Sequence, residues 1–324
     1  MSLVLTCLMD QGMLSRDSLE VIGAGKSLAS DLGAGLAVAV IGAETSALCA
    51  AAGEYGAGKI YSVQDASLEQ YYCEGYLAAL EAVCRECKPV AVLFVTNMQG
   101  RELAPRLAKR LNKAALVDCL SFNVEHETGR IIFTKPVFGG KAMAQVVLSD
   151  APAVVALRRR SFEPAQQDQV EPEIIQVKPV SIPVNPFKVM ERVEEQQAGV
   201  RLEDARVVVS GGQGLGGPEN FAILEELAGL LGGAVGASRV AVDSGWVSSS
   251  KQVGQTGKIV APDVYLAVGI SGACQHLAGC SGAKVIVAIN TDPEAPVFGA
   301  ARLGVVGDYK DVLPPLIKKV KEII

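Results

Sequence analysis

Residues 206–231 read RVVVSGGQGLGGPENFAILEELAGLL, and this stretch decides the fold. Arg206–Val209 is an apolar run that predicts a buried strand, and Pro218–Leu231 has apolar residues at helical spacing. The turn between them carries the pattern GxGxxG, which joins a strand to a helix in nucleotide-binding domains, at Gly212, Gly214 and Gly217. The stretch therefore predicts the strand, turn and helix of a Rossmann-like domain.

An NAD site of the usual kind is not expected at this turn. Such a site has an acidic residue about 20 positions after the glycines, where it binds the ribose. This chain has Ala237, Ser238 and Arg239 there instead.

Strands and helices alternate on both sides of the stretch, which is typical of parallel sheets covered by helices. The strands predicted are Val4–Cys7, Leu36–Ile41, Lys59–Val63, Ala91–Val95, Val264–Ile270, Val285–Ile289 and Val305–Val306. The helices predicted are Ser15–Leu32, Thr45–Tyr55, Ser67–Glu86, Leu103–Leu111 and Val312–Ile323, the last one beginning near Pro314. Shorter β-like runs, including Arg130–Thr134 and Met143–Leu148, fill residues 115–157. The fold class is α/β, with two domains that are each a mainly parallel sheet flanked by helices.

The domain boundary is expected in a segment rich in proline. A chain of 324 residues exceeds the usual size of a single core, and prolines recur between Ser161 and Gly199. We expect an N-terminal α/β domain over 1–185, a linker over 186–203 and a C-terminal domain over 204–324. One further strand is predicted at Glu173–Val177.

Composition excludes several classes of protein. The formal net charge is −5, so the chain lacks the basic field of a nucleic-acid-binding protein, and Arg158–Arg160 is expected on a solvated face. The apolar runs are too short to span a membrane. The eight cysteines lie in apolar stretches, as reduced thiols do, and the CxxC of Cys84 and Cys87 has no second pair that would complete a metal site. No leader-like segment precedes Leu3, which favours a bacterial cytoplasmic protein; a mature mitochondrial matrix protein would read the same.

A ligand site is predicted in residues 236–276, GASRVAVDSGWVSSSKQVGQTGKIVAPDVYLAVGISGACQH. Three turns in this stretch combine glycine with hydroxyl, amide or charged side chains, as turns that bind anionic ligands do. They contain Ser238 and Arg239; Gln255 and Thr256; and Ser271, Gln275 and His276. Trp246 is expected to pack beneath the loop.

These residues resemble the FAD-binding half of the electron transfer flavoprotein alpha subunit. The motifs that carry the resemblance are ASR, VDSGW, QVGQTGK, GISGACQHLAG and AINTDPEAPVF, and a looser similarity covers GRELAPRLAKRL at residues 100–111. The resemblance implies that the C-terminal domain binds FAD and that the N-terminal domain holds no flavin and contacts a beta subunit. It implies FAD contacts at Gln213, Ser238, Arg239, Val253, Gly254, Gln255, Thr256, Ser271, Gly272, Ala273, Cys274, Gln275, His276, Asn290, Asp308 and Tyr309.

Arg239, Thr256 and His276 are the residues expected to tune the flavin, through charge and hydrogen bonds near its ring. Many family members have arginine where this chain has Gln213, so the phosphate contact at that position is weaker here. No catalytic residue and no metal site are predicted, because the bound FAD supplies the redox chemistry.

The resemblance implies an electron carrier and not an enzyme. It would form a heterodimer with the beta subunit and pass electrons from acyl-CoA or other flavin dehydrogenases, as in fatty acid beta-oxidation, to a membrane quinone oxidoreductase or another acceptor. Two alternatives stay open at this point: a subunit of an electron-bifurcating flavoprotein complex, and a stand-alone NAD-dependent enzyme.

Overall fold

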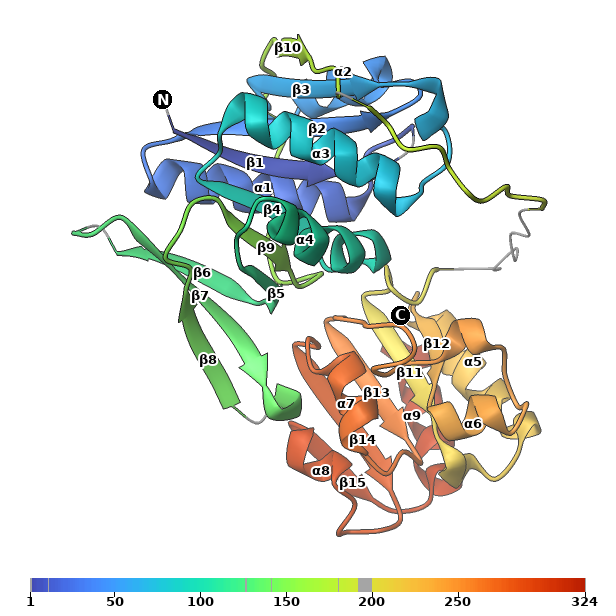
Figure 1. Cartoon of the computed structure of the whole chain (residues 1–324). Helices are drawn as coiled ribbons and strands as arrows, with labels where there is room; N and C mark the ends of the chain where they lie inside the picture. The colour runs from blue at the N-terminus through green and yellow to red at the C-terminus, as the bar shows by residue number, and fades with distance from the viewer. Residues whose placement is uncertain are drawn as a thin grey trace. The chain divides into compact units, whose positions relative to one another are not determined.

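The computed structural model describes residues 2–10, 12–125, 127–140, 142–179, 181–191 and 200–323. The chain forms two compact units, Met1–Arg192 and Val193–Ile324, called unit 1 and unit 2 below. Figure 1 colours unit 1 from blue to yellow-green and unit 2 from yellow to red. Each unit is built on its own parallel sheet.

Unit 1 contains a seven-stranded sheet in the order β10-β3-β2-β1-β4-β9-β5, with every neighbouring pair parallel. Its strands are β1 (Leu3–Leu8), β2 (Gly35–Gly42), β3 (Lys59–Gln64), β4 (Ala91–Val95), β5 (Ala115–Cys119), β9 (Ala153–Leu157) and β10 (Glu173–Gln176). Its helices are α1 (Arg16–Asp31), α2 (Ser46–Gly53), α3 (Cys73–Cys87) and α4 (Met98–Arg110). The strands and helices predicted for these residues are thus confirmed in type and order.

Two cores cover the two faces of this sheet. Successive residues of β1 alternate between them, with Val4 packed on one side and Leu5 on the other. Helices α1 and α2 contribute to the first core, and α3 and α4 to the second. Figure 1 shows the two pairs of helices on opposite sides of the sheet.

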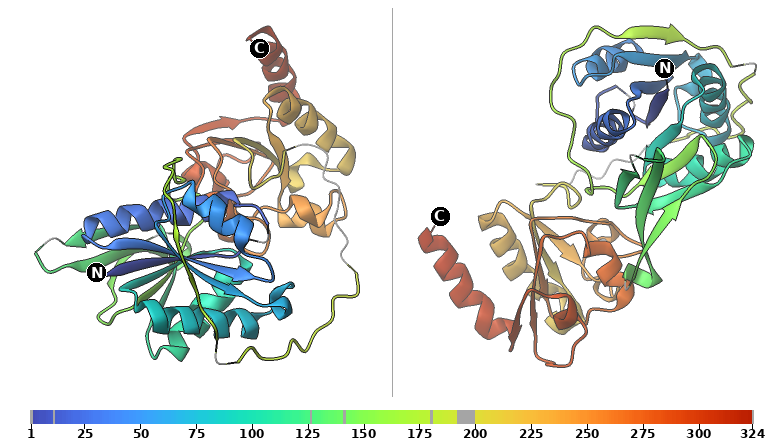
Figure 2. Two further views of the ribbon diagram at one scale, coloured as in Figure 1. Left: turned by 90° about the horizontal axis from the view of Figure 1, so that it is seen from above. Right: turned by 90° about the vertical axis from the view of Figure 1, so that its left-hand side faces the viewer.

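A separate three-stranded antiparallel sheet projects from the body of unit 1 (Figures 1 and 2). It consists of β6 (Ser121–Glu125), β7 (Arg130–Val137) and β8 (Ala142–Val147). The two β-like runs predicted within residues 130–148 are confirmed here, and Phe133 is the residue of β7 that enters the core of the unit.

Two helix starts in unit 1 were predicted wrongly, and a polar side chain sets one of them, the start of α4. The predicted helix Ser67–Glu86 is a short 3-10 turn, Ala66–Leu68, followed by α3 from Cys73. Helix α4 begins at Met98 and not at Leu103, since the side chain of Asn97 accepts a hydrogen bond from the Gly100 amide at 2.8 Å.

The prediction that Arg158–Arg160 lies on a solvated face was also wrong. These residues follow β9, and each meets a carboxylate. Arg158 pairs with Asp118 at 2.7 Å, and Arg159 pairs with Asp17 at 2.9 Å. The side chain of Arg160 is only 6% exposed and lies 4.0 Å from the carboxylate of Glu20.

Unit 2 contains a five-stranded parallel sheet in the order β12-β11-β13-β14-β15. Its strands are β11 (Val207–Gly211), β12 (Ala234–Ala237), β13 (Val264–Val268), β14 (Val285–Asn290) and β15 (Leu303–Val306). Its helices are α5 (Phe221–Leu230), α6 (Arg239–Asp243), α7 (Cys274–Cys280), α8 (Val297–Ala300) and α9 (Tyr309–Ile323). Strand β12 lies on one side of β11, and β13 lies on the other. The strand order therefore reverses at β11, and the carboxyl end of this strand is next to a topological switch point.

Two helices of unit 2 differ from their predicted bounds. The predicted helix Pro218–Leu231 is a 3-10 turn, Pro218–Asn220, followed by α5. Helix α9 begins at Tyr309 instead of near Pro314, because the carboxylate of Asp308 accepts a hydrogen bond from the Lys310 amide and caps the helix.

Candidate functional site

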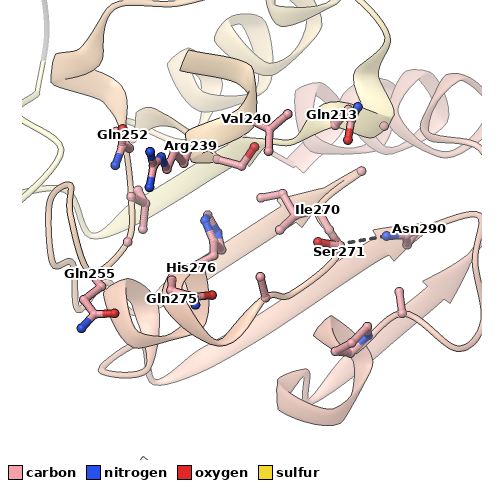
Figure 3. Close-up of a pocket in the computed structure, with 18 of the residues that line it drawn as sticks. Gln213, Arg239, Val240, Gln252, Gln255, Ile270, Ser271, Gln275, His276 and Asn290 are labelled. Carbon is pink, nitrogen blue, oxygen red and sulfur yellow. Dashed lines mark hydrogen bonds between the residues drawn. The ribbon is translucent and has the colours of Figure 1, made fainter. Parts of the chain in front are cut away.

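A cavity of about 600 Å³ opens at the carboxyl ends of the strands of unit 2. Open parallel sheets bind ligands at this edge, next to the switch point. Figure 3 shows the side chains that surround it. Its lining includes twelve of the residues predicted to contact FAD, namely Gln213, Ser238, Arg239, Val253, Gly254, Gln255, Thr256, Ser271, Ala273, Gln275, His276 and Asn290.

The glycine-rich turn after β11 packs directly on the turn after β13. A side chain on Gly212 would place its Cβ 2.2 Å from the carbonyl oxygen of Gly269, so only glycine fits there. The Gly212 amide donates to the Val268 carbonyl and the Gly214 amide to the Gly269 carbonyl, both at 2.9 Å. Two amides of the GxGxxG pattern are therefore already bonded, which explains physically why the turn is not a usual pyrophosphate cradle.

Ser238 and Arg239 lie at the start of α6, an element that the sequence interpretation treated as a turn. The Ser238 hydroxyl caps this helix by accepting a hydrogen bond from the Ala241 amide at 3.4 Å. The Arg239 side chain is 68% exposed and pairs with Asp243 at 3.1 Å. Asp243 was not predicted to take part in the site, although its position four residues after Arg239 on a helix was the available signal.

The loop that carries Gln255 and Thr256 is held by side-chain and backbone bonds. The side-chain amide of Gln252 donates to the Thr256 hydroxyl at 3.0 Å. The backbone amide of Gln255 donates to the backbone carbonyl of Gln275 at 2.8 Å. Gln252 lines the cavity and was missed by the sequence interpretation. The Thr256 hydroxyl keeps its own proton for donation, because Gln252 uses only its oxygen.

The turn that joins β13 to α7 needs glycine at Gly272. Its φ is +86°, and a Cβ there would lie 2.2 Å from the amide nitrogen of Val297. That amide donates to the Ser271 carbonyl at 3.0 Å. Neither Gly272 nor the exposed Cys274 lines the cavity, so their contacts with FAD stay predictions.

His276 lies in the first turns of α7 and is 7% exposed. Its Nε2 is 2.9 Å from the hydroxyl of Tyr265, and its Nδ1 is buried and has no hydrogen-bond partner among the described residues. Burial lowers the pKa of His276 to about 4, so the imidazole is neutral at neutral pH. An unpaired buried polar atom in the wall of a cavity is one that a ligand can satisfy.

The resemblance places Asn290, Asp308 and Tyr309 on the adenosine side of FAD, and only the first of them lines the cavity. Asn290 lines the cavity at the end of β14 and donates from its side-chain amide to the Ile270 carbonyl at 2.9 Å. Asp308 and Tyr309 are not part of the lining: Asp308 caps α9, and the buried Tyr309 donates to the Leu215 carbonyl at 3.0 Å. Their FAD contacts stay predictions as well. Trp246 packs against the core of unit 2.

The cysteines and the acidic residues offer no competing centre. Among the residues that the structure describes, no group of three or more His, Cys, Asp or Glu side chains is placed to hold a metal ion. Burial raises the pKa of the Cys87 thiol to about 12 and that of Cys84 still higher, so both thiols of the CxxC are protonated. No helix in the described ranges is long and apolar enough to cross a membrane.

Comparison with known proteins decides the family. The electron transfer flavoprotein FAD-binding domain matches residues 201–281, and the electron transfer flavoprotein domain matches residues 3–182. The chain belongs to the electron transfer flavoprotein alpha subunit family. The first match covers most of the cavity lining, which indicates FAD as the cofactor.

Three relatives illustrate the similarity. The chain is 39% identical to electron transfer flavoprotein subunit alpha of Thermoanaerobacterium thermosaccharolyticum over 96% of this chain and 95% of the relative. It is 39% identical to protein FixB of Clostridium saccharobutylicum, over 97% and 94%. It is 37% identical to electron transfer flavoprotein subunit alpha of Bacillus subtilis, over 96% and 95%. The chain is thus an electron-carrying flavoprotein subunit, as the sequence predicted.

Proposed function

We propose that the FAD of this family binds in the cavity of unit 2, against the side chains named above. The observation that carries this proposal is the cavity of about 600 Å³ at the carboxyl ends of the strands, whose lining falls mostly within the region that matches the FAD-binding domain. The boundaries that we propose are an N-terminal domain over 1–185 that contacts the partner, a linker over 186–203 and an FAD-binding domain over 204–324.

The flavin supplies the redox chemistry when it is bound, and the protein binds it and tunes it. Thr256 and His276 are the proposed hydrogen-bond donors to the ring. Arg239 contributes a permanent positive charge, which Asp243 partly offsets. Ser238, Ser271 and Asn290 are the proposed polar contacts along the rest of the cofactor.

We infer that the chain works as a heterodimer with an electron transfer flavoprotein beta subunit, because its relatives are named alpha subunits. The donors in this proposal are acyl-CoA or other flavin dehydrogenases, and the acceptor is a quinone oxidoreductase or a comparable protein. The relatives quoted are bacterial, which supports the bacterial cytoplasm as the location.

The proposal is tested by filling the cavity. The chain is produced together with its beta subunit, and flavin is counted from its absorbance. Ser271→Tyr places a ring in the cavity, whereas the control Ser281→Tyr changes an exposed serine outside the lining.

About one FAD per alpha chain is expected in the parent and in Ser281→Tyr, with a large loss in Ser271→Tyr. Equal occupancy in the two variants would place FAD elsewhere and refute the proposed site.

A further inference from the structure

We propose that Tyr265 is a positioning residue for His276: its hydroxyl donates to Nε2, which keeps the imidazole proton on Nδ1 and holds that N–H ready for the flavin. Tyr265 lies on β13, the middle strand of the unit 2 sheet, and is fully buried. The inference rests on the proposed function, since it assigns the flavin as the partner of Nδ1. The sequence interpretation did not single out Tyr265.

The chemistry of the two groups sets the direction of this hydrogen bond. A phenol is a stronger donor than a neutral imidazole, and the bare nitrogen of imidazole is a stronger acceptor than a phenol oxygen. A neutral imidazole carries one proton, on either nitrogen. Donation from Tyr265 to Nε2, across 2.9 Å, therefore leaves the proton on Nδ1.

The surroundings keep both partners in the required protonation state. Burial raises the pKa of Tyr265 well above its usual range, so the phenol keeps its proton. Burial also lowers the pKa of His276, so the imidazole stays neutral. The pair is thus a neutral donor and a neutral acceptor, and neither buried group carries a charge that would need a counter-ion.

Ser210 supports the same direction from the neighbouring strand. It lies on β11, is fully buried, and its hydroxyl makes no hydrogen bond within the described residues. Strand β11 pairs with β13, and the Ser210 hydroxyl opposes the rise in the pKa of Tyr265, as a group that donates to the phenol oxygen would. Its proton is free to turn toward that oxygen, and the chain of donors then runs from Ser210 through Tyr265 to His276.

The Nδ1 atom of His276 is the last donor in this series of hydrogen bonds. A tautomer with the proton on Nδ1 makes it a donor, and the carbonyl oxygens of a flavin are acceptors. Without Tyr265, Nε2 would lose its donor, and the preference for a proton on Nδ1 would weaken. The hydroxyl of Tyr265 therefore favours the tautomer in which His276 donates from Nδ1.

The first test measures the tautomer of His276 by nitrogen-15 NMR of the histidine rings in the FAD-loaded heterodimer. The chain has two histidines, His126 and His276, and His276→Asn identifies the signals of His276. We expect the proton on Nδ1 in the parent and a mixture of tautomers in Tyr265→Phe, which removes only the hydroxyl. A parent protein with the proton on Nε2 would overturn the proposal, and this measurement needs no folded Tyr265 variant.

The second test measures the reduction potential of the bound flavin. Tyr265→Phe and His276→Asn should each change the equilibrium constant between oxidised and reduced flavin about threefold to tenfold, or about 30 to 60 mV for one electron. The double variant should shift no further than His276→Asn alone, because both changes remove the same contact. The control is Tyr76→Phe, a buried tyrosine of unit 1, which should keep the potential of the parent.

The outcomes separate this inference from the proposed function. An unchanged potential in Tyr265→Phe beside a changed one in His276→Asn would overturn the role of Tyr265 and leave the flavin site intact. Additive shifts in the double variant would also overturn it. A purified heterodimer without flavin would refute the proposed function, and the tautomer in the flavin-free protein would still decide the pairing of Tyr265 with His276.

Discussion

His276 makes the stability of unit 2 depend on pH in a window that its burial defines. Its pKa falls from an ordinary 6.5 to about 4 in the folded protein. Between these values the unfolded chain binds a proton that the folded chain does not, so the free energy of unfolding decreases as the pH is lowered. Above pH 6.5 this residue has no such effect, and below about 4 the loss is complete. The gap of about 2.5 pH units corresponds to about 3 kcal/mol at most.

The assay uses the only tryptophan of the chain, Trp246, which packs against the core of unit 2. Urea unfolding of the flavin-free chain, followed by the fluorescence of this residue, gives the free energy of unfolding at a series of pH values from 7 to 4. The comparison protein is His276→Gln, in which the amide cannot titrate. The expected result is a steeper loss of stability with acid in the parent than in the variant.

The difference between the two curves isolates His276, because the other titrating groups are common to both proteins. The part of this difference that does not depend on pH reports how well glutamine packs in place of histidine. The part that changes with pH reports the titration of His276. Parallel curves between pH 6.5 and 4 would show that the folded protein protonates His276 as readily as the unfolded chain does. The conclusion that the imidazole of His276 is neutral, on which the role of Tyr265 depends, would then be wrong.

Three further predictions concern the cavity and the glycines of unit 2. Arg239→Ala should lower the potential of the bound flavin by about 40 mV, the value for a solvent-exposed charge near 4 Å, and Asp243→Asn should raise it; redox titrations that show shifts of the same sign would contradict this. Thr256→Ala should also lower the potential, by an amount near that of one hydrogen bond, about 1 kcal/mol, and an unchanged titration would exclude the contact. Gly212→Ala should destabilise unit 2 by more than about 1 kcal/mol through its clash with backbone, whereas Gly229→Ala on α5, where nothing lies within 4 Å, should stabilise it by up to about 1 kcal/mol; equal urea midpoints would refute the clash.

Most strands and their order along the chain were predictable because each is a short apolar run between turn residues; β12 was not predicted. The starts of α4 and α9 were not predictable, because a single capping side chain fixes each of them. The cap of Asn97 starts α4 at Met98, five residues before the predicted start. The cap of Asp308 starts α9 at Tyr309, ahead of the two prolines inside that helix. A capping bond depends on local backbone geometry, which residue spacing describes poorly.

Most of the candidate site was predictable for a different reason. Its residues follow the carboxyl ends of parallel strands, and the sheet brings such positions together whatever lies between them. Not every partner of those residues was predictable. Tyr265 beneath His276 emerges only when the backbone is folded, whereas Asp243 beside Arg239 could have been found from its helical spacing once α6 was recognised as a helix. The ion pairs of Arg158–Arg160 were not predictable either, since their carboxylates come from distant segments.

The cavity has a consequence for how this protein can diversify. All of its lining residues lie between Gln213 and Pro296, within one compact unit. Changes to the cavity and changes to the surface of unit 1 therefore fall in separate stretches of sequence. Recombination with a relative at a junction near residue 200 would exchange the cavity and keep the surface of unit 1, so the two can be inherited independently.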